Sequence, residues 1–125
     1  MKRVIKAQNA PAAIGPYSHA ISVGDLLFTS GQIPLDPETG KLVGGSIEEQ
    51  TEQVLKNLEA VLSANHMSFE NVVKTTVFIT DLADFSKINE VYATRFKNEP
   101  PARSCVQVAA LPAGAKIEIE LVASK

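Results

Sequence analysis

Short apolar runs near the N-terminus predict two strands. Residues 20–23 read Ala-Ile-Ser-Val and residues 26–29 read Leu-Leu-Phe-Thr, and Gly24-Asp25 separates them. A Gly-Asp pair between two apolar runs is typical of a tight turn. Residues 34–45 follow with two prolines and three glycines. This stretch is therefore expected to be a loop with room for a small hairpin.

The apolar spacing changes to that of a helix after residue 46. Ser46 and Glu49 have the spacing of a capping box, in which side chains satisfy the first backbone N–H groups of a helix. Asn65 is expected to end this helix in a left-handed conformation. Six residues between these signals form one apolar stripe, which predicts a helix: Ile47, Val54, Leu55, Leu58, Val61 and Leu62.

Strands and a second helix are expected in the second half. Val72 to Thr80 is rich in β-branched residues, which favour a long strand. Asp84 is placed to cap the second helix, and Pro100-Pro101 forbids its continuation. One face of this helix carries Phe85, Ile88, Tyr92 and Phe96. Two further strands, at about residues 104–110 and 116–123, complete an α+β fold in which both helices cover one face of a sheet.

Alternation within the later strands divides their side chains between two faces. We expect one set to meet the helices: Val73, Val77, Ile79, Val106, Val108, Ile117, Ile119 and Leu121. The opposite set mixes charged, polar and small side chains: Lys74, Thr76, Arg103, Cys105, Gln107, Glu118 and Glu120. Such a face suits either a subunit interface or a binding site, and the pattern does not choose between them. The alternation also predicts that Arg103, Cys105 and Glu118 point the same way.

Composition narrows the class of protein. The 125 residues suffice for a single domain, 1–125, with its own core. The net charge is −2 and no run of Lys or Arg occurs, so a nucleic-acid partner is not expected. A single cysteine, Cys105, excludes an internal disulfide and a cysteine-based zinc site, and no metal spacing is visible. Without a signal-like N-terminus or a membrane-length apolar run, a cytoplasmic protein is expected.

Five separated motifs resemble the RidA/YjgF family. They are residues 10–18 (APAAIGPYS), 30–34 (SGQIP), 74–78 (KTTVF), 81–92 (DLADFSKINEVY) and 101–106 (PARSCV), the last followed by Leu111-Pro112 and Ile117-Glu118-Ile119. The resemblance covers about residues 9–123. It implies a chorismate-mutase-like mixed sheet and a homotrimer with clefts between subunits. It also implies hydrolysis of 2-aminoacrylate/2-iminopropanoate and 2-iminobutanoate to 2-keto acids and ammonia, without a cofactor.

The resemblance also implies the site residues. It gives catalytic roles to Arg103, Glu118 and Tyr17, and substrate contacts to Arg103, Cys105, Ser30, Gly31 and Asn89. Many relatives have glutamate and arginine where this chain has Gln107 and Ala110. These two differences bear on which substrate the protein prefers.

Each of these residues has a structural alternative. Arg103 could grip a substrate carboxylate with its planar fork. It could instead form a structural ion pair with Glu118 or Glu120, which the residue types alone favour and the family resemblance disfavours.

Glu118 could direct a water molecule and carry its proton, or simply face solvent. Tyr17 could act through its hydroxyl or only pack. Ser30 and Gly31 could offer backbone donors or only end a strand. Cys105 is expected to be a small apolar wall rather than a nucleophile, because neither histidine is visibly linked to it.

Two other functions compete with imine hydrolysis. A non-catalytic trimer could use the same cleft to bind or sense a small ligand, and the presence of Arg103 favours the enzyme. A ribonuclease or translation inhibitor would need clustered basic residues, which the chain lacks.

Overall fold

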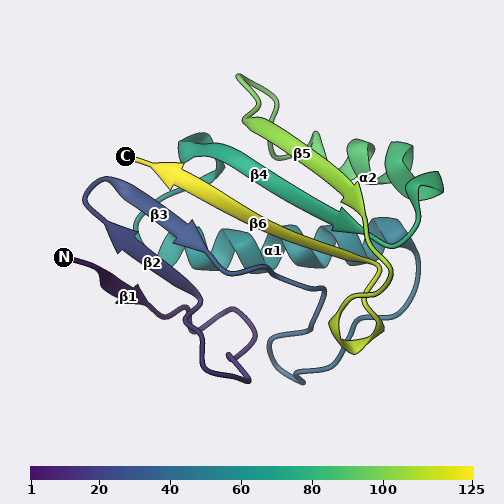
Figure 1. Cartoon of the computed structure of the whole chain (residues 1–125), viewed down its shortest axis with the longest axis horizontal. Helices are drawn as coiled ribbons and strands as arrows, with labels where there is room; N and C mark the ends of the chain where they lie inside the picture. The colour runs from purple at the N-terminus through teal and green to yellow at the C-terminus, as the bar shows by residue number, and fades with distance from the viewer.

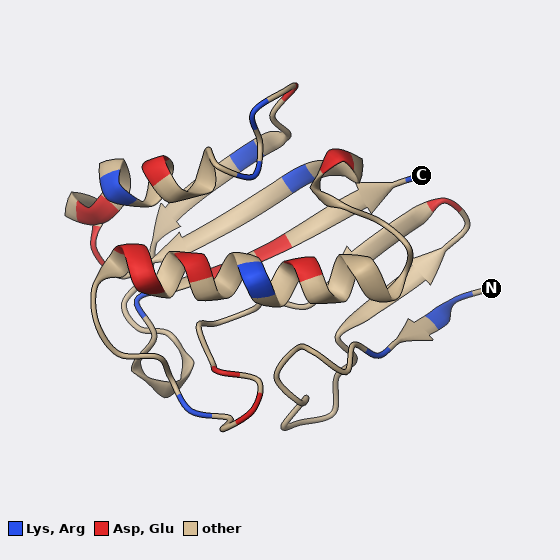
Figure 2. Cartoon of the chain, turned by 180° about the vertical axis from the view of Figure 1, so that it is seen from behind, with Lys and Arg blue, Asp and Glu red and all other residues tan.

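The computed structural model describes all residues, 1–125, and contains one six-stranded sheet with two α-helices on one side (Figure 1). The sheet order is β1-β2-β3-β6-β4-β5, and only β4 and β5 run parallel. The strands are β1 (Arg3–Ile5), β2 (Ala20–Val23), β3 (Leu26–Thr29), β4 (Val72–Ile79), β5 (Ala102–Gln107) and β6 (Ile117–Ser124). The helices are α1 (Ile47–Ala64) and α2 (Phe85–Tyr92). Both cover the face of the sheet that is turned toward the viewer in Figure 2. The predicted α+β class is confirmed.

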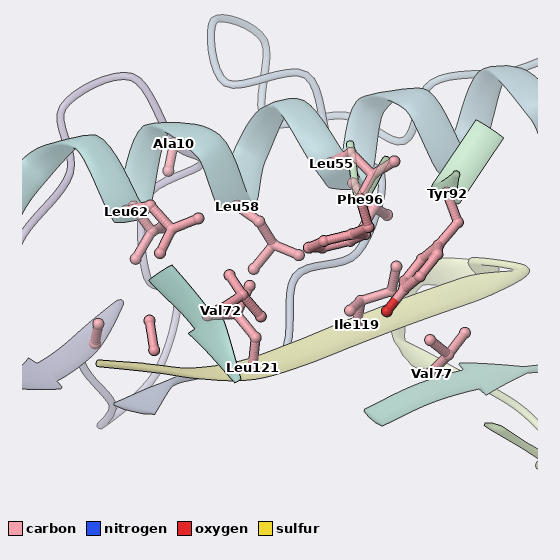
Figure 3. Close-up of a cluster of buried hydrophobic side chains, with 14 of the residues drawn as sticks. Ala10, Leu55, Leu58, Leu62, Val72, Val77, Tyr92, Phe96, Ile119 and Leu121 are labelled. Atoms are coloured by element: carbon pink, nitrogen blue, oxygen red, sulfur yellow. The ribbon is translucent and has the colours of Figure 1, made fainter. Parts of the chain in front are cut away.

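Helix α1 begins and packs as its sequence predicts. The Ser46 hydroxyl accepts a hydrogen bond from the Glu49 backbone N–H at 3.2 Å. Leu55, Leu58 and Leu62 point from α1 toward the sheet and are fully buried (Figure 3). Each such side chain contributes roughly 1.5–3 kcal/mol by leaving water, so the apolar stripe rather than the cap holds α1 on the sheet. Neither helix is long and apolar enough to cross a membrane.

The predicted left-handed conformation at Asn65 is wrong. Asn65 does cap α1, but its φ is −112°, and the left-handed residue is the exposed His66, at φ 58°. The Asn65 side chain is buried, where its amide nitrogen donates to the Met67 sulfur at 3.7 Å. The chain therefore reverses one residue later, outside the core.

Helix α2 starts differently from the prediction. Asp84 occupies the N-cap position, but its side chain makes no capping hydrogen bond. A short 3-10 turn, η2 (Leu82–Asp84), precedes α2, and Asp81 caps it by accepting from the Ala83 N–H at 2.9 Å. Gln107 of β5 accepts from the Leu82 N–H at 2.9 Å. The start of α2 is therefore tied to the edge strand.

The predicted strand faces are partly wrong. Val77, Ile79, Ile117, Ile119 and Leu121 are buried beneath the helices, as expected. Val73 is exposed because a β-bulge between Val72 and Lys74 shifts the alternation. Val106 is also exposed, since Cys105, and not Val106, lies beside the buried Val77. In β5 both alternating sets mix small and polar residues, so hydrophobicity could not reveal which set faces inward.

Candidate active site

The predicted site residues form two groups on opposite faces of the sheet. Arg103 lies beside the buried Thr75, so it faces the helices, and Cys105 lies beside Val77 on the same side. Glu118 pairs with Phe78 on the face that no helix covers. The prediction that Arg103, Cys105 and Glu118 point the same way is therefore wrong within one chain, because the phase of β5 is opposite to the one expected.

The Arg103 group consists of Arg103 and Cys105 from β5 with Phe85, Asn89 and Tyr92 from α2. Arg103 Nη1 donates to Asn89 Oδ1 at 2.7 Å. The guanidinium carbon lies 4.9 Å from the centre of the Tyr92 ring and 5.3 Å from that of Phe85. Cation–π attraction to the two rings and one hydrogen bond hold the guanidinium in place.

No carboxylate of the same chain pairs with Arg103. The chain forms a single ion pair, between Arg95 and Glu52. A structural ion pair of Arg103 with Glu118 or Glu120 is therefore not formed within one chain. Asn89 uses one donor of the guanidinium, and a guanidinium carries five. A held arginine with free donors is suited to bind an anion.

Tyr92 provides the rigid floor beneath Arg103. Its hydroxyl and the Thr75 hydroxyl are hydrogen-bonded at 2.7 Å, and Tyr92 is 7% exposed. Burial raises the pKa of Tyr92, although the Thr75 hydrogen bond and the Arg103 charge oppose the shift. The phenol therefore stays neutral at physiological pH. Burial favours Tyr92 as a support rather than as a proton donor to a substrate.

Arg103 borders two hollows in the protein surface. One, of about 340 Å³, is lined by Asn89, Tyr92, Ala93, Phe96, Pro100, Pro101 and Arg103. The other, of about 520 Å³, is lined by Leu82, Phe85, Arg103 and Cys105. The largest hollow, about 780 Å³, lies around the 94–102 loop and contains none of the predicted site residues. The two smaller hollows are the more relevant, because they give a small molecule access to the charged group.

The Glu118 group consists of Glu118, Gly31 and Ser30 on the face without helices, and Tyr17 lies in the segment to which Ser30 is hydrogen-bonded. Gln32 and Ile119 exchange backbone hydrogen bonds of 2.9 and 3.1 Å, which hold Gly31 against β6. A side chain at position 31 would begin 2.8 Å from the Glu118 carboxyl carbon, so the glycine lets this carboxylate lie directly against the backbone. Burial raises the pKa of Glu118, and the nearby Glu120 raises it further. A carboxylate with a raised pKa holds a proton more readily, which suits a group that takes up and returns protons.

Ser30 and Tyr17 are linked through the backbone. The Ser30 hydroxyl donates to the Ser18 carbonyl oxygen at 2.6 Å, so it ties two segments together. Tyr17 is 48% exposed, its ring lies beside Gly15, and its hydroxyl makes no hydrogen bond within the chain. Within one chain Tyr17 is therefore not a core residue, and its role stays a prediction.

Comparison with known proteins identifies the family. The family model described as Endoribonuclease L-PSP, which is that of the RidA/YjgF proteins, matches residues 7–125. The chain belongs to the RidA/YjgF family. The family resemblance predicted from the five motifs is thus confirmed.

Individual relatives agree with this assignment. The chain is 54% identical over 123 residues to Reactive Intermediate Deaminase A, chloroplastic, of Arabidopsis thaliana, and the match spans 98% of this chain and 66% of that protein. It is 50% identical over 123 residues to human 2-iminobutanoate/2-iminopropanoate deaminase, and this match spans 98% of this chain and 90% of that protein. The crystal structure of E. coli TdcF with bound serine superposes with a TM-score of 0.94 at 45% identity, covering 98% of each chain.

Cys105 in this RidA/YjgF chain has the surroundings of a neutral thiol. Burial raises its pKa, and the Arg103 charge only partly opposes the shift. A thiol with a raised pKa is a poor nucleophile. No three His, Cys, Asp or Glu side chains lie close enough together to hold a metal ion.

Phe85, Tyr92 and Thr75 were not predicted as part of the site. The sequence placed the first two on the apolar face of a helix, where core residues are the ordinary expectation. Their contact with Arg103 depends on β5 lying parallel to β4 at the sheet edge. Only a pairing of strands that are distant in sequence reveals it.

Proposed function

We propose that this RidA/YjgF protein hydrolyses 2-iminopropanoate, formed from 2-aminoacrylate, and 2-iminobutanoate to the 2-keto acids and ammonia. The observation that carries the proposal is Arg103, which two aromatic rings and Asn89 hold in place and which forms no ion pair within its own chain. A 2-imino acid offers a carboxylate that matches the planar donor fork of such a residue.

We propose that the working site forms between subunits of a C3 homotrimer. The Arg103 and Glu118 groups lie on opposite faces of one chain, so a single chain does not bring them together. The face without helices carries exposed Phe28 and Val106, which a subunit contact would cover. Cyclic symmetry would bring the Glu118 group of one protomer to the Arg103 group of the next at each interface.

In the proposed reaction the Arg103 fork binds the substrate carboxylate and fixes the C=N bond beside Glu118. Water adds to the imine carbon, one of its protons passes to the Glu118 carboxylate, and Glu118 returns that proton to the nitrogen, which gives a carbinolamine. Glu118 then takes the proton of the new hydroxyl and passes it to the amino nitrogen, so that the C=O bond forms as the C–N bond breaks and ammonia leaves the 2-keto acid. The raised pKa of Glu118 suits a group that must both take and return a proton. Positioning of the two reactants supplies the remainder of the rate gain.

The relatives support this choice of substrate. The human relative is named for 2-iminobutanoate and 2-iminopropanoate, and the E. coli relative binds serine. Serine carries a carboxylate next to a carbon that bears nitrogen, which is the arrangement of the proposed substrates. The endoribonuclease description of the family is the less favoured alternative, because the sequence has no run of Lys or Arg and these residues lie on several helices, strands and loops (Figure 2).

A coupled assay tests the proposed function. A serine or threonine dehydratase generates the imine, and the appearance of keto acid is followed with and without the purified protein. We expect the protein to accelerate keto-acid release from both imines. No acceleration by the correctly assembled protein would overturn the proposal and favour a trimer that only binds the ligand.

A further inference from the structure

We propose that His19 is a positioning residue for the Glu118 group, acting through the irregular segment that carries Tyr17. The effect on turnover rests on the proposed imine hydrolysis, whereas the effect on the segment itself does not. His19 is 5% exposed and has no contact with the Arg103 group.

Both ring nitrogens of His19 are bonded to the backbone. The Ala7 N–H donates to Nδ1 at 2.9 Å, so Nδ1 carries no proton. Nε2 lies 2.8 Å from the Pro11 carbonyl oxygen and therefore carries the proton and donates it. Only the neutral ring with its proton on Nε2 satisfies both partners.

These two bonds hold a segment that lacks regular structure. No helix or strand lies between the end of β1 at Ile5 and the start of β2 at Ala20. The ring therefore holds Ala7 and Pro11 from inside the loop that they form. Without the ring, the buried Ala7 N–H would lose its partner and the loop would rearrange.

The same residue joins this segment to the site. The His19 carbonyl oxygen accepts from the Ser30 N–H at 2.9 Å, and the neighbouring Ser18 carbonyl accepts from the Ser30 hydroxyl. Ser30 precedes Gly31, which lies against the Glu118 carboxylate. Tyr17 is two residues before His19. The segment that the buried ring holds therefore contains Tyr17 and is joined through the His19 and Ser18 carbonyls to Ser30, next to Gly31.

The two bonds of the ring can be removed separately. In His19→Asn the amide oxygen stands near the place of Nδ1 and can accept from Ala7, while Pro11 loses its donor. In His19→Gln the amide nitrogen reaches the place of Nε2 and can donate to Pro11, while Ala7 loses its acceptor. His19→Phe keeps the ring shape and loses both bonds. His66→Asn is the matched control, because His66 is exposed and asparagine tolerates its positive φ.

The first measurement needs no activity. We expect His19→Phe to increase amide hydrogen exchange at Ala7, Ser30 and Gln32, whose N–H groups are hydrogen-bonded in the wild type, while α1 stays protected, and His66→Asn to change none of these. In the wild type, nitrogen NMR of the ring should show the form protonated at Nε2. Unchanged exchange in His19→Phe, or a ring protonated at Nδ1, would overturn the inference whatever the protein catalyses.

The second measurement is imine hydrolysis by folded variants of wild-type assembly state. Misplacing a reacting group by about an ångström costs up to roughly a hundredfold in rate, so His19→Phe should lose about ten- to a hundredfold in kcat. KM should change less, because Arg103 is untouched. His19→Asn and His19→Gln should each recover part of the loss. Wild-type kcat in both His19→Phe and His19→Asn would refute the inference, whereas an inactive wild type would refute only the proposed function.

Discussion

At the scale of single residues, substitution of Arg103 by lysine tests whether its positive charge or its planar donor geometry matters for imine hydrolysis. Lysine supplies the charge but not the planar two-donor fork. Loss of one charge-assisted hydrogen bond costs about 1.5–3 kcal/mol, or roughly ten- to a hundredfold in rate if it is felt in the transition state. We expect Arg103→Lys to lose that much in kcat/KM for imine hydrolysis, and Arg103→Ala to lose more. A folded Arg103→Lys protein with wild-type kinetics would exclude the two-donor grip.

The ionised Glu118 carboxylate is expected to lower the stability of the folded protein while it serves turnover. Burial and Glu120 raise its pKa above that of the unfolded chain, so the folded protein binds the proton more tightly. Stability is lost as the pH rises through the folded pKa, where the carboxylate becomes charged. Glu118→Gln keeps the shape without the charge, so its melting temperature at neutral pH should be at least that of the wild type, with the difference vanishing in acid.

Turnover of Glu118→Gln should fall sharply, because an amide cannot take up a proton. The substrate KM should change little. Kinetics at several pH values, beside thermal melts of the same samples, check both halves of this prediction. A wild-type kcat in Glu118→Gln would contradict the role given to Glu118. So would a variant that melts below the wild type at neutral pH but not in acid.

Cys105 is expected to be dispensable for the chemistry. Its pKa is raised by burial, so it is a wall of the hollow and not a nucleophile. Cys105→Ala should retain most imine hydrolysis. Loss of all turnover in a folded Cys105→Ala protein would show that the thiol reacts. Alkylation of the wild-type thiol should still inhibit, because the adduct would occupy the hollow beside Arg103.

At the scale of elements, the contact between β4 and α2 supports the arginine. Thr75→Val keeps the shape of the side chain but leaves the buried Tyr92 hydroxyl without its partner. We expect a loss of about 1–3 kcal/mol in the free energy of unfolding, measured by urea denaturation, with a lower kcat/KM. Thr39→Val is the control, because it also removes a hydrogen bond, from the Lys41 N–H at 3.2 Å, but in an exposed loop where water can replace it, so stability should change by less than about 0.5 kcal/mol. Equal stability of the two variants would mean that the Tyr92 hydroxyl finds another partner.

The elements also show what sequence patterns could and could not predict. The stripe of α1 and the β-branched run of β4 located both elements within a residue or two, because burial imposes their periodicities. The bulge at Val73 and the phase of β5 escaped, since each depends on strand pairing and not on local hydrophobicity. The same error placed Arg103 and Glu118 on one face. The family resemblance supplied the site residues, while their division into two groups needed the fold.

At the scale of the whole molecule, the proposed reaction needs more than one chain. If Arg103 binds the substrate and Glu118 carries the proton, a monomer would be unproductive, because the sheet separates the two residues. A closed ring of three protomers would join unlike groups at every interface and would cover the apolar positions of the open face. Light scattering of the wild type should accordingly give the mass of a trimer.

Mixing two inactive variants tests the shared site most directly. Arg103→Ala lacks the carboxylate anchor, and Glu118→Gln lacks the proton carrier. When the two are unfolded together in equal amounts and reassembled, random mixing in a ring of three should leave about a quarter of the interfaces with both native residues. We predict imine hydrolysis at about a quarter of the wild-type rate, while each variant reassembled alone stays near background. A mixture of trimer mass that is no more active than its separate components would contradict a site shared between neighbouring chains.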